Sequence, residues 1–105
     1  MDTRALFRML VKEKASDLII KADACPCMRV QGKIKFISDS RVPDAFAQTL
    51  TNDVIPDLLK PRFEKNGEVD CSYAVPEVGR FRANVFRQQG KLCLVFRHVT
   101  DEIPS

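Results

Sequence analysis

The polar and apolar positions near the start of the chain change from a helical to a strand-like period. Residues 2–14 place apolar side chains on one helical face, and Asp2 or Thr3 can cap the start of that helix. Residues 16–22 contain a short apolar run, which is typical of a buried strand. We therefore expect an amphipathic helix that leads into a strand.

Four apolar side chains around a glycine predict a hairpin in the next part of the chain. Met28, Val30, Ile34 and Phe36 alternate with polar residues. A three-residue loop over residues 31–33 would keep all four on one face, whereas a two-residue turn would mix the faces. The pattern therefore favours the three-residue loop.

Two short helices are expected in the middle of the chain. Pro43 suits the first helical position of a helix over residues 43–50. A second helix is expected over residues 56–65, although Pro61 fits poorly in a helix interior because it lacks an N–H group. Gly67 can adopt the left-handed backbone at which such a helix ends.

The last part of the chain has the clearest alternation, in residues 69–75, 80–88 and 91–99, which predicts three strands. The expected order of elements is α-β-β-β-α-α-β-β-β. This order predicts an α+β domain of the PAS-like kind, with a mostly antiparallel sheet of about five or six strands and about three packed helices. We expect residues 1–105 to form a single domain.

The register of the last hairpin brings two arginines together. If residues 89–90 form a two-residue turn, Ala83 faces Phe96 on the core side of the sheet. The opposite side then sets Arg82 directly across from Arg97. Two like charges repel there unless an anion lies over them, and the planar fork of arginine suits phosphate or carboxylate.

The positive charge of the chain is concentrated in its C-terminal part. The 105 residues are 45% hydrophobic and 30% charged, and the net charge of +3 is too small to argue for nucleic-acid binding. Residues 80–98 nevertheless contain five Lys or Arg residues and no acid. Two interpretations are open: an anion site, or arginines that are solvated or paired with nearby acids such as Asp70 or Glu68.

Several kinds of chemistry have no residues to support them. A phosphate-binding loop needs G-x-x-x-x-G-K-[ST], and neither Gly32 nor Gly90 stands in that motif, so we expect no nucleotide hydrolysis by this chain alone. His98 is the only histidine and cannot form a hydrolase triad by itself. The chain also lacks a continuous apolar segment long enough for a signal peptide or a membrane-spanning helix, so a cytoplasmic location is expected.

The four cysteines do not have the spacing of a zinc site. Cys25 and Cys27 form a C-x-C pair, while Cys71 and Cys93 stand alone within expected strands. Free cysteines in strands behave as small hydrophobic residues. We expect no bound metal.

Four segments resemble the N-terminal domain of the type IV pilus retraction ATPases, a family within the secretion ATPases. The matching segments are residues 15–18, 28–33, 62–70 and, most specifically, Gly79-Arg80-Phe81-Arg82-Ala83-Asn84-Val85-Phe86-Arg87-Gln88. The resemblance extends over the whole chain. It implies a PAS-like domain that precedes a RecA-like P-loop domain in a hexameric motor, with that catalytic domain absent from this chain.

The resemblance also implies partners and site residues. In such motors the N-terminal domain packs on catalytic domains of its own and of the neighbouring subunit, and arginines of its last strands approach bound ATP. Arg82 matches that role best, and Arg80, Arg87 and Arg97 are further candidates for nucleotide or subunit contacts. ATP and magnesium would belong to the longer parent, and this chain alone would hold no cofactor. The parent would lie in the cytoplasm beside the inner membrane, on a pilus platform protein, without nucleic acid.

Two alternatives remain: the equivalent domain of a type II secretion or pilus assembly ATPase, and a stand-alone PAS-like sensor or interaction module. A ligand sensor needs a cavity within the fold. The apolar residues expected to pack on the sheet offer no obvious cavity: Phe36, Phe81, Val85, Leu94 and Phe96. The resemblance therefore favours the motor.

Overall fold

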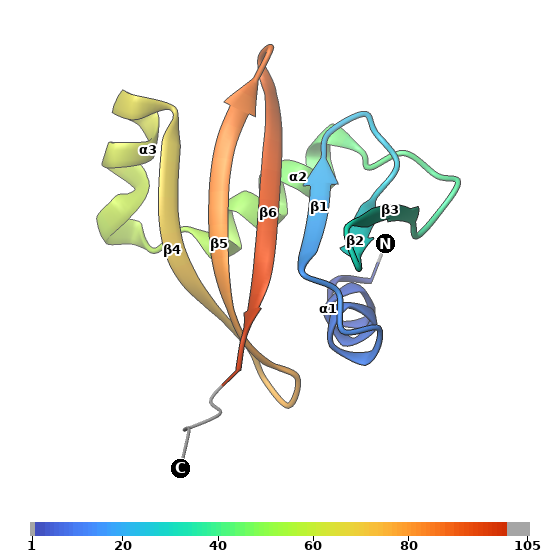
Figure 1. Ribbon diagram of the computed structural model, residues 1–105. Helices are drawn as coiled ribbons and strands as arrows, with labels where there is room; N and C mark the ends of the chain where they lie inside the picture. Colours follow the sequence, from blue (N-terminus) through green and yellow to red (C-terminus); the bar gives the residue numbers. More distant parts are fainter. Residues whose placement is uncertain (1, 101–105) are drawn as a thin grey trace.

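The computed structural model describes residues 2–100, which form an α+β domain with one six-stranded sheet in the order β3-β2-β1-β6-β5-β4 (Figure 1). Every pair of neighbouring strands in the sheet is antiparallel. The elements are α1 (Thr3–Lys12), β1 (Asp17–Lys21), β2 (Cys27–Val30), β3 (Lys33–Phe36), α2 (Asp44–Val54), the 3₁₀ turn η1 (Asp57–Leu59), α3 (Lys60–Asn66), β4 (Glu68–Val75), β5 (Gly79–Gln88) and β6 (Lys91–Val99). The expected fold class and order of elements are confirmed.

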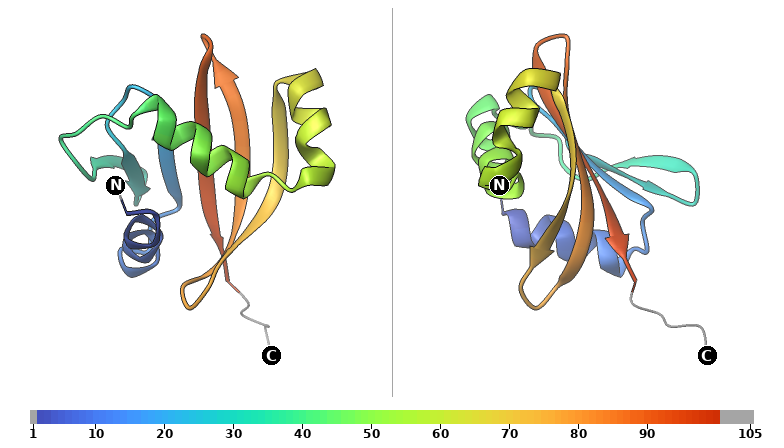
Figure 2. Two further views of the ribbon diagram at one scale, coloured as in Figure 1. Left: turned by 180° about the vertical axis from the view of Figure 1, so that it is seen from behind. Right: turned by 90° about the vertical axis from the view of Figure 1, so that its left-hand side faces the viewer.

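The three helices pack against one face of the sheet and leave the other face without a helix (Figure 2). Phe7 of α1 is fully buried, and its ring centroid lies 4.7 Å from those of Phe81 and Phe96. Alternate residues of β1, β5 and β6, such as Leu18, complete this core. We call the sheet face without helices the open face.

The helix ends follow local chemistry. Asp2 caps α1, because its carboxylate accepts a hydrogen bond from the backbone N–H of Ala5 at 3.3 Å. The sequence pattern placed Pro43 at the first helical position of α2. In the structure Pro43 is instead the N-cap of this helix. Gly67 ends α3 with φ +74°, as expected.

The expected continuous helix over residues 56–65 is divided in two. The chain forms the 3₁₀ turn η1 and then starts α3 at Lys60, with Leu59 as its N-cap. This new start places Pro61 in the first turn of α3, where the missing N–H group has no helical partner to lose.

The β5–β6 hairpin has the predicted register. Gln89 and Gly90 form a two-residue turn with φ +54° and +79°, and Ala83 faces Phe96 on the core side. Arg82 is therefore directly across from Arg97 on the open face.

The prediction for the β2–β3 hairpin is wrong. Val30 pairs with Lys33, so the loop is a two-residue turn over residues 31–32, in which both residues have positive φ. Met28 is 1% exposed, whereas Phe36 on the other side of the hairpin is 67% exposed. Phe36 consequently does not belong to the apolar core in which the sequence pattern placed it. The physical reason is that such turns match the right-handed twist of the strands, and this fixes the register.

Candidate functional site

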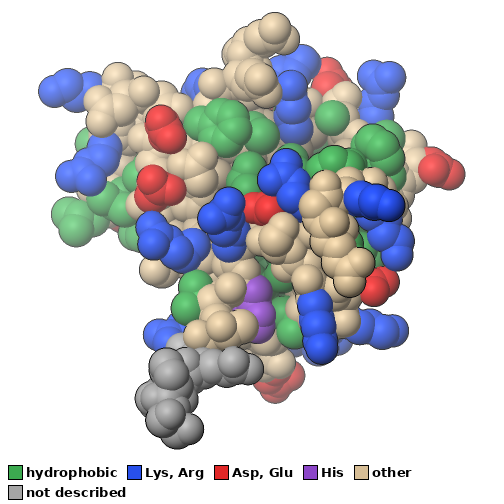
Figure 3. Space-filling view, viewed as in Figure 1, with side chains coloured by type: hydrophobic (Ala, Val, Ile, Leu, Met, Phe, Trp, Pro, Cys, Tyr) green, Lys and Arg blue, Asp and Glu red, His purple; other side chains and the backbone are tan. Residues whose placement is uncertain are grey.

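A shallow depression of about 450 Å³ lies on the open face, over β5 and β6. Its lining residues are Asp70, Arg82, Ala83, Asn84, Val95 and Arg97. Figure 3 shows this face of the molecule, on which basic side chains gather around a small acidic patch. We call this feature the arginine depression.

Arg82 supplies an exposed positive charge to the arginine depression. The alternation of β5 turns its side chain away from the core, because Phe81 and Ala83 on either side are buried. Within residues 2–100 the side chain of Arg82 makes no hydrogen bond and no ion pair. This guanidinium group is therefore available to an external anion.

Arg97 is held by an acid that sequence reasoning missed. Its Nε–H donates a hydrogen bond of 3.0 Å to Oδ1 of Asp17, the first residue of β1. The Asp17 side chain is only 5% exposed, and its Oδ2 also accepts a 2.8 Å hydrogen bond from the Ser16 hydroxyl and lies 3.6 Å from Nη1 of Arg29. A carboxylate next to the apolar run of residues 18–20 was the available sequence signal, since buried acids need partners.

The surroundings of Asp17 stabilise its ionised form. Burial alone would raise the pKa of this carboxyl group, but the hydrogen bonds from Ser16 and Arg97 and the charges of Arg97 and Arg29 outweigh it. The pKa of Asp17 is therefore lower than the ordinary value for aspartate. Asp17 remains a charged partner of Arg97 at neutral pH.

The acids that the sequence suggested as local partners bind a different residue. Asp70 and Glu68 accept hydrogen bonds of 3.0 and 3.2 Å from the side-chain amide of Asn84. Of the two cross-strand arginines, Arg97 is therefore paired with an acid, namely Asp17, and Arg82 is not.

The four candidate arginines do not form one cluster. Arg80 shares the open face with Arg82 and Arg97 and lies across from Val99. Arg87 has the opposite orientation, with its guanidinium carbon 5.1 Å from the ring centroid of Phe63 on the helix-covered side.

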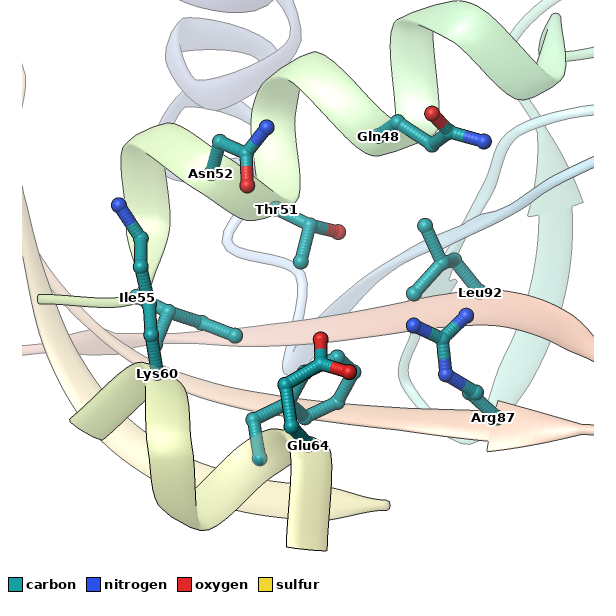
Figure 4. Close-up of a pocket in the computed structure, with 9 residues that line it drawn as sticks. Gln48, Thr51, Asn52, Ile55, Lys60, Glu64, Arg87 and Leu92 are labelled. Carbon is teal, nitrogen blue, oxygen red and sulfur yellow. The ribbon is translucent and has the colours of Figure 1, made fainter. Parts of the chain in front are cut away.

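Arg87 lines a second pocket of about 320 Å³ between α2, α3 and the end of the β5–β6 hairpin (Figure 4). Glu64 and Lys60 of α3 also line this pocket, and Lys60 forms a 2.7 Å ion pair with Asp57. Thr51 contributes a buried hydroxyl group that finds no partner among the described residues. The structure thus divides the candidates into three residues on the open face and one in a separate pocket.

The cysteines of the described part of the chain are all free thiols. Burial raises the pKa of Cys71 and Cys93, which favours the neutral thiol. Among residues 2–100 no three His, Cys, Asp or Glu side chains gather into a set that could hold a metal ion. Nor does any helix in this part of the chain have the length and apolar character required to cross a membrane.

Comparison with known proteins shows similarity along the whole chain, although no family model matches it. The chain is 33% identical over 103 residues to the type IV pilus retraction ATPase PilT of Pseudomonas aeruginosa, which covers 98% of the chain and 30% of PilT. A crystal structure of the pilus retraction motor PilT with bound ADP superimposes with a TM-score of 0.88 at 36% identity, over 99% of this chain and 31% of that one. The chain is similar to the N-terminal domain of the PilT family.

This similarity to PilT agrees with the resemblance found in the sequence, which was to the same N-terminal domain. The type IV pilus ATPase PilU of the same organism is 26% identical over 105 residues, which cover 100% of the chain and 28% of PilU. The chain therefore spans about three tenths of the length of the curated relatives it matches.

Proposed function

We propose that this chain is the subunit-contact and regulatory domain of a hexameric type IV pilus retraction ATPase. Its open face lies against the RecA-like catalytic domain of a neighbouring subunit, and Arg82 reaches the phosphates of ATP bound there. Rigid-body movement of the two domains opens and closes the nucleotide site. The similarity to PilT and PilU along the whole chain supports this proposal.

The position of Arg82 is the observation that carries the proposal. Its guanidinium group is exposed on a sheet face that no helix covers, in a depression that it shares with Arg97. Asp17 forms an ion pair with Arg97, but no described residue forms an ion pair with Arg82. A phosphate oxygen or an acid of another subunit would supply the missing negative charge.

The remaining candidates take different places in this proposal. Arg80 lies on the same face as Arg82 and belongs to the same interface. Arg87 is on the helix-covered side, so in this proposal it contacts acids of a subunit and not the nucleotide.

Binding and hydrolysis of ATP are assigned to the catalytic domain of the parent. This chain has no P-loop motif, and residues 2–100 offer no ligand set for magnesium. Its guanidinium groups fit the phosphate oxygens of ATP, and they would stabilise charge that develops during phosphoryl transfer. The parent would work in the cytoplasm, on a platform protein of the pilus machinery in the inner membrane.

ATP turnover of the complete parent protein tests this role. We expect Arg82→Ala to lower turnover by about ten-fold or more while hexamers still form, as for the loss of a contact that stabilises transition-state charge. Light scattering after size-exclusion chromatography checks the hexamer.

Arg62→Ala is the matched control, because Arg62 is an exposed arginine of α3 outside the arginine depression. It should turn over ATP like the wild type. Unchanged turnover in an intact Arg82→Ala hexamer would contradict the proposed arginine role.

A further inference from the structure

Asp17 links the β2–β3 and β5–β6 hairpins on the open face. It lies on β1, between β2 and β6. One carboxylate oxygen accepts a hydrogen bond from Arg97, and the other accepts one from Ser16 and forms an ion pair with Arg29. The side chain is almost completely buried, so these contacts replace the water that an exposed carboxylate would have. The Asp17 carboxylate is therefore held in one position by its neighbours.

The contact with Asp17 limits the positions that Arg97 can adopt. The bond uses the Nε–H group, which lies nearest the aliphatic chain, and it leaves the terminal nitrogens of the guanidinium group for other acceptors. The Arg97 side chain is 70% exposed despite this bond, and it lines the arginine depression. An anion that enters the depression meets a guanidinium group that is already oriented.

The same contact lets two like charges stay close together. Arg82 and Arg97 are direct cross-strand partners, and such a pair of cations is unfavourable by itself. The negative charge of Asp17 offsets part of this repulsion, because it lies against Arg97. Without Asp17, Arg97 could rotate into solvent and away from Arg82.

We propose that Asp17 is the positioning residue of an anion site in which Arg82 and Arg97 bind one phosphate group together. This inference rests on the proposed function, because it explains how the arginine face is prepared for the phosphates of a nucleotide. Asp17 does not touch the anion, and it acts through the orientation of Arg97.

Asp70 makes the inference testable, because it lines the same depression without contacting either arginine through a hydrogen bond or ion pair. Charge alone predicts that removing either acid strengthens the binding of an anion. Positioning predicts opposite signs for the two acids: the loss of Asp17 weakens binding, and the loss of Asp70 does not.

The experiment is a titration of the 105-residue chain with inorganic phosphate, followed by NMR of the arginine Nε–H groups. We expect the Arg82 and Arg97 signals to shift together in the wild type. Asp17→Asn should raise the Kd for phosphate by about five-fold or more, as expected for directly coupled residues. Asp70→Asn should bind phosphate at least as tightly as the wild type.

Two further variants separate positioning from a general loss of structure. Arg97→Lys keeps the charge but lacks the planar fork, so it should weaken phosphate binding. This variant tests the role of Arg97 independently of whether Asp17→Asn folds. In the Arg97→Ala background, Asp17→Asn should cause no additional loss, because the residue through which Asp17 acts is already absent.

The inference is overturned if Asp17→Asn folds and binds phosphate as tightly as the wild type or more tightly. It is also overturned if phosphate leaves the Arg82 and Arg97 signals of the wild type unmoved. The proposed function fails by a different result, namely unchanged ATP turnover in the Arg82→Ala parent. The failure of the inference and the failure of the proposed function are therefore distinguishable.

Discussion

The β2–β3 and β5–β6 hairpins have the same turn but distribute their apolar side chains differently. Each turn consists of a glutamine followed by a glycine, with φ +51° and +79° at residues 31–32 and +54° and +79° at residues 89–90. In β5–β6 this register places Ala83 and Phe96 on the core side together. In β2–β3 it places Met28 in the core and Phe36 on the exposed side.

The difference shows that the register follows the turn geometry even where the apolar pattern favours another pairing. A two-residue turn with two left-handed residues matches the twist of the strands and allows one pairing. Strand β6 is central in the sheet, and its alternating residues agree with that pairing. Strand β3 is an edge strand with all four residues exposed, so no burial opposes the turn.

Truncation of one phenylalanine in each hairpin should give the largest contrast. Phe96 is fully buried against Phe7, so Phe96→Ala should lower the free energy of unfolding by about 3–5 kcal/mol. Phe36→Ala should lower it by less than about 1 kcal/mol, because that ring is largely exposed. Urea denaturation measures both values. Equal losses would mean that Phe36 packs in the core after all.

Asp17→Asn should have the next largest effect, because Asp17 contacts one arginine from each hairpin. We expect a loss of about 1–3 kcal/mol at pH 7, from charge-assisted hydrogen bonds to a buried carboxylate. The pKa of Asp17 is lowered in the folded state, so its contribution is present above the unfolded pKa of about 3.9 and is lost as the pH falls through the folded value.

Urea denaturation at pH 7 and at pH 3 checks this dependence. The difference in stability between the wild type and Asp17→Asn should be smaller at pH 3, because this pH lies below the unfolded pKa of about 3.9 and the unfolded state then binds a proton that the folded state binds less readily. A difference that is the same at both pH values would show that the ionised form of Asp17 does not stabilise the fold.

Alanine at the two turn glycines should have a moderate and equal effect. Gly32 and Gly90 both have φ +79°, and a Cβ atom at either position meets no atom within 4 Å. Gly32→Ala and Gly90→Ala should therefore each cost about 1 kcal/mol, which reflects the left-handed backbone alone. Thermal or urea unfolding measures the cost. Clearly unequal values would show that the two turns are not equivalent.

Threonine at Ile34 should have the smallest effect. The substitution keeps a β-branched side chain at an exposed position of β3, and we expect a change in unfolding free energy within about 0.5 kcal/mol. Val85→Thr in β5 is the matched control, because it buries a hydroxyl group in the core and should cost about 1–3 kcal/mol. A large loss from Ile34→Thr would indicate a hidden contact of β3.

The sequence by itself determined the order of the elements, the α+β fold class and the pairing of β5 with β6. These features depend on local chemistry and on strands in which the apolar alternation and the turn favour the same register. The cross-strand pairing of Arg82 with Arg97 follows from such an agreement. The family resemblance was also carried by local segments, and the similarity to PilT agrees with it. What the pattern could not determine was the β2–β3 register, because its edge strand has no buried face to specify it.

Only the tertiary structure decided how the candidate site is built. Arg97 meets Asp17, eighty positions earlier in the chain, because β1 pairs with β6. Arg87 leaves the open face because strand alternation turns it toward Phe63. Spacing along a sequence predicts which residues share a strand face. The partner of a buried charge depends instead on which strands become neighbours, and long-range strand pairing determines those neighbours.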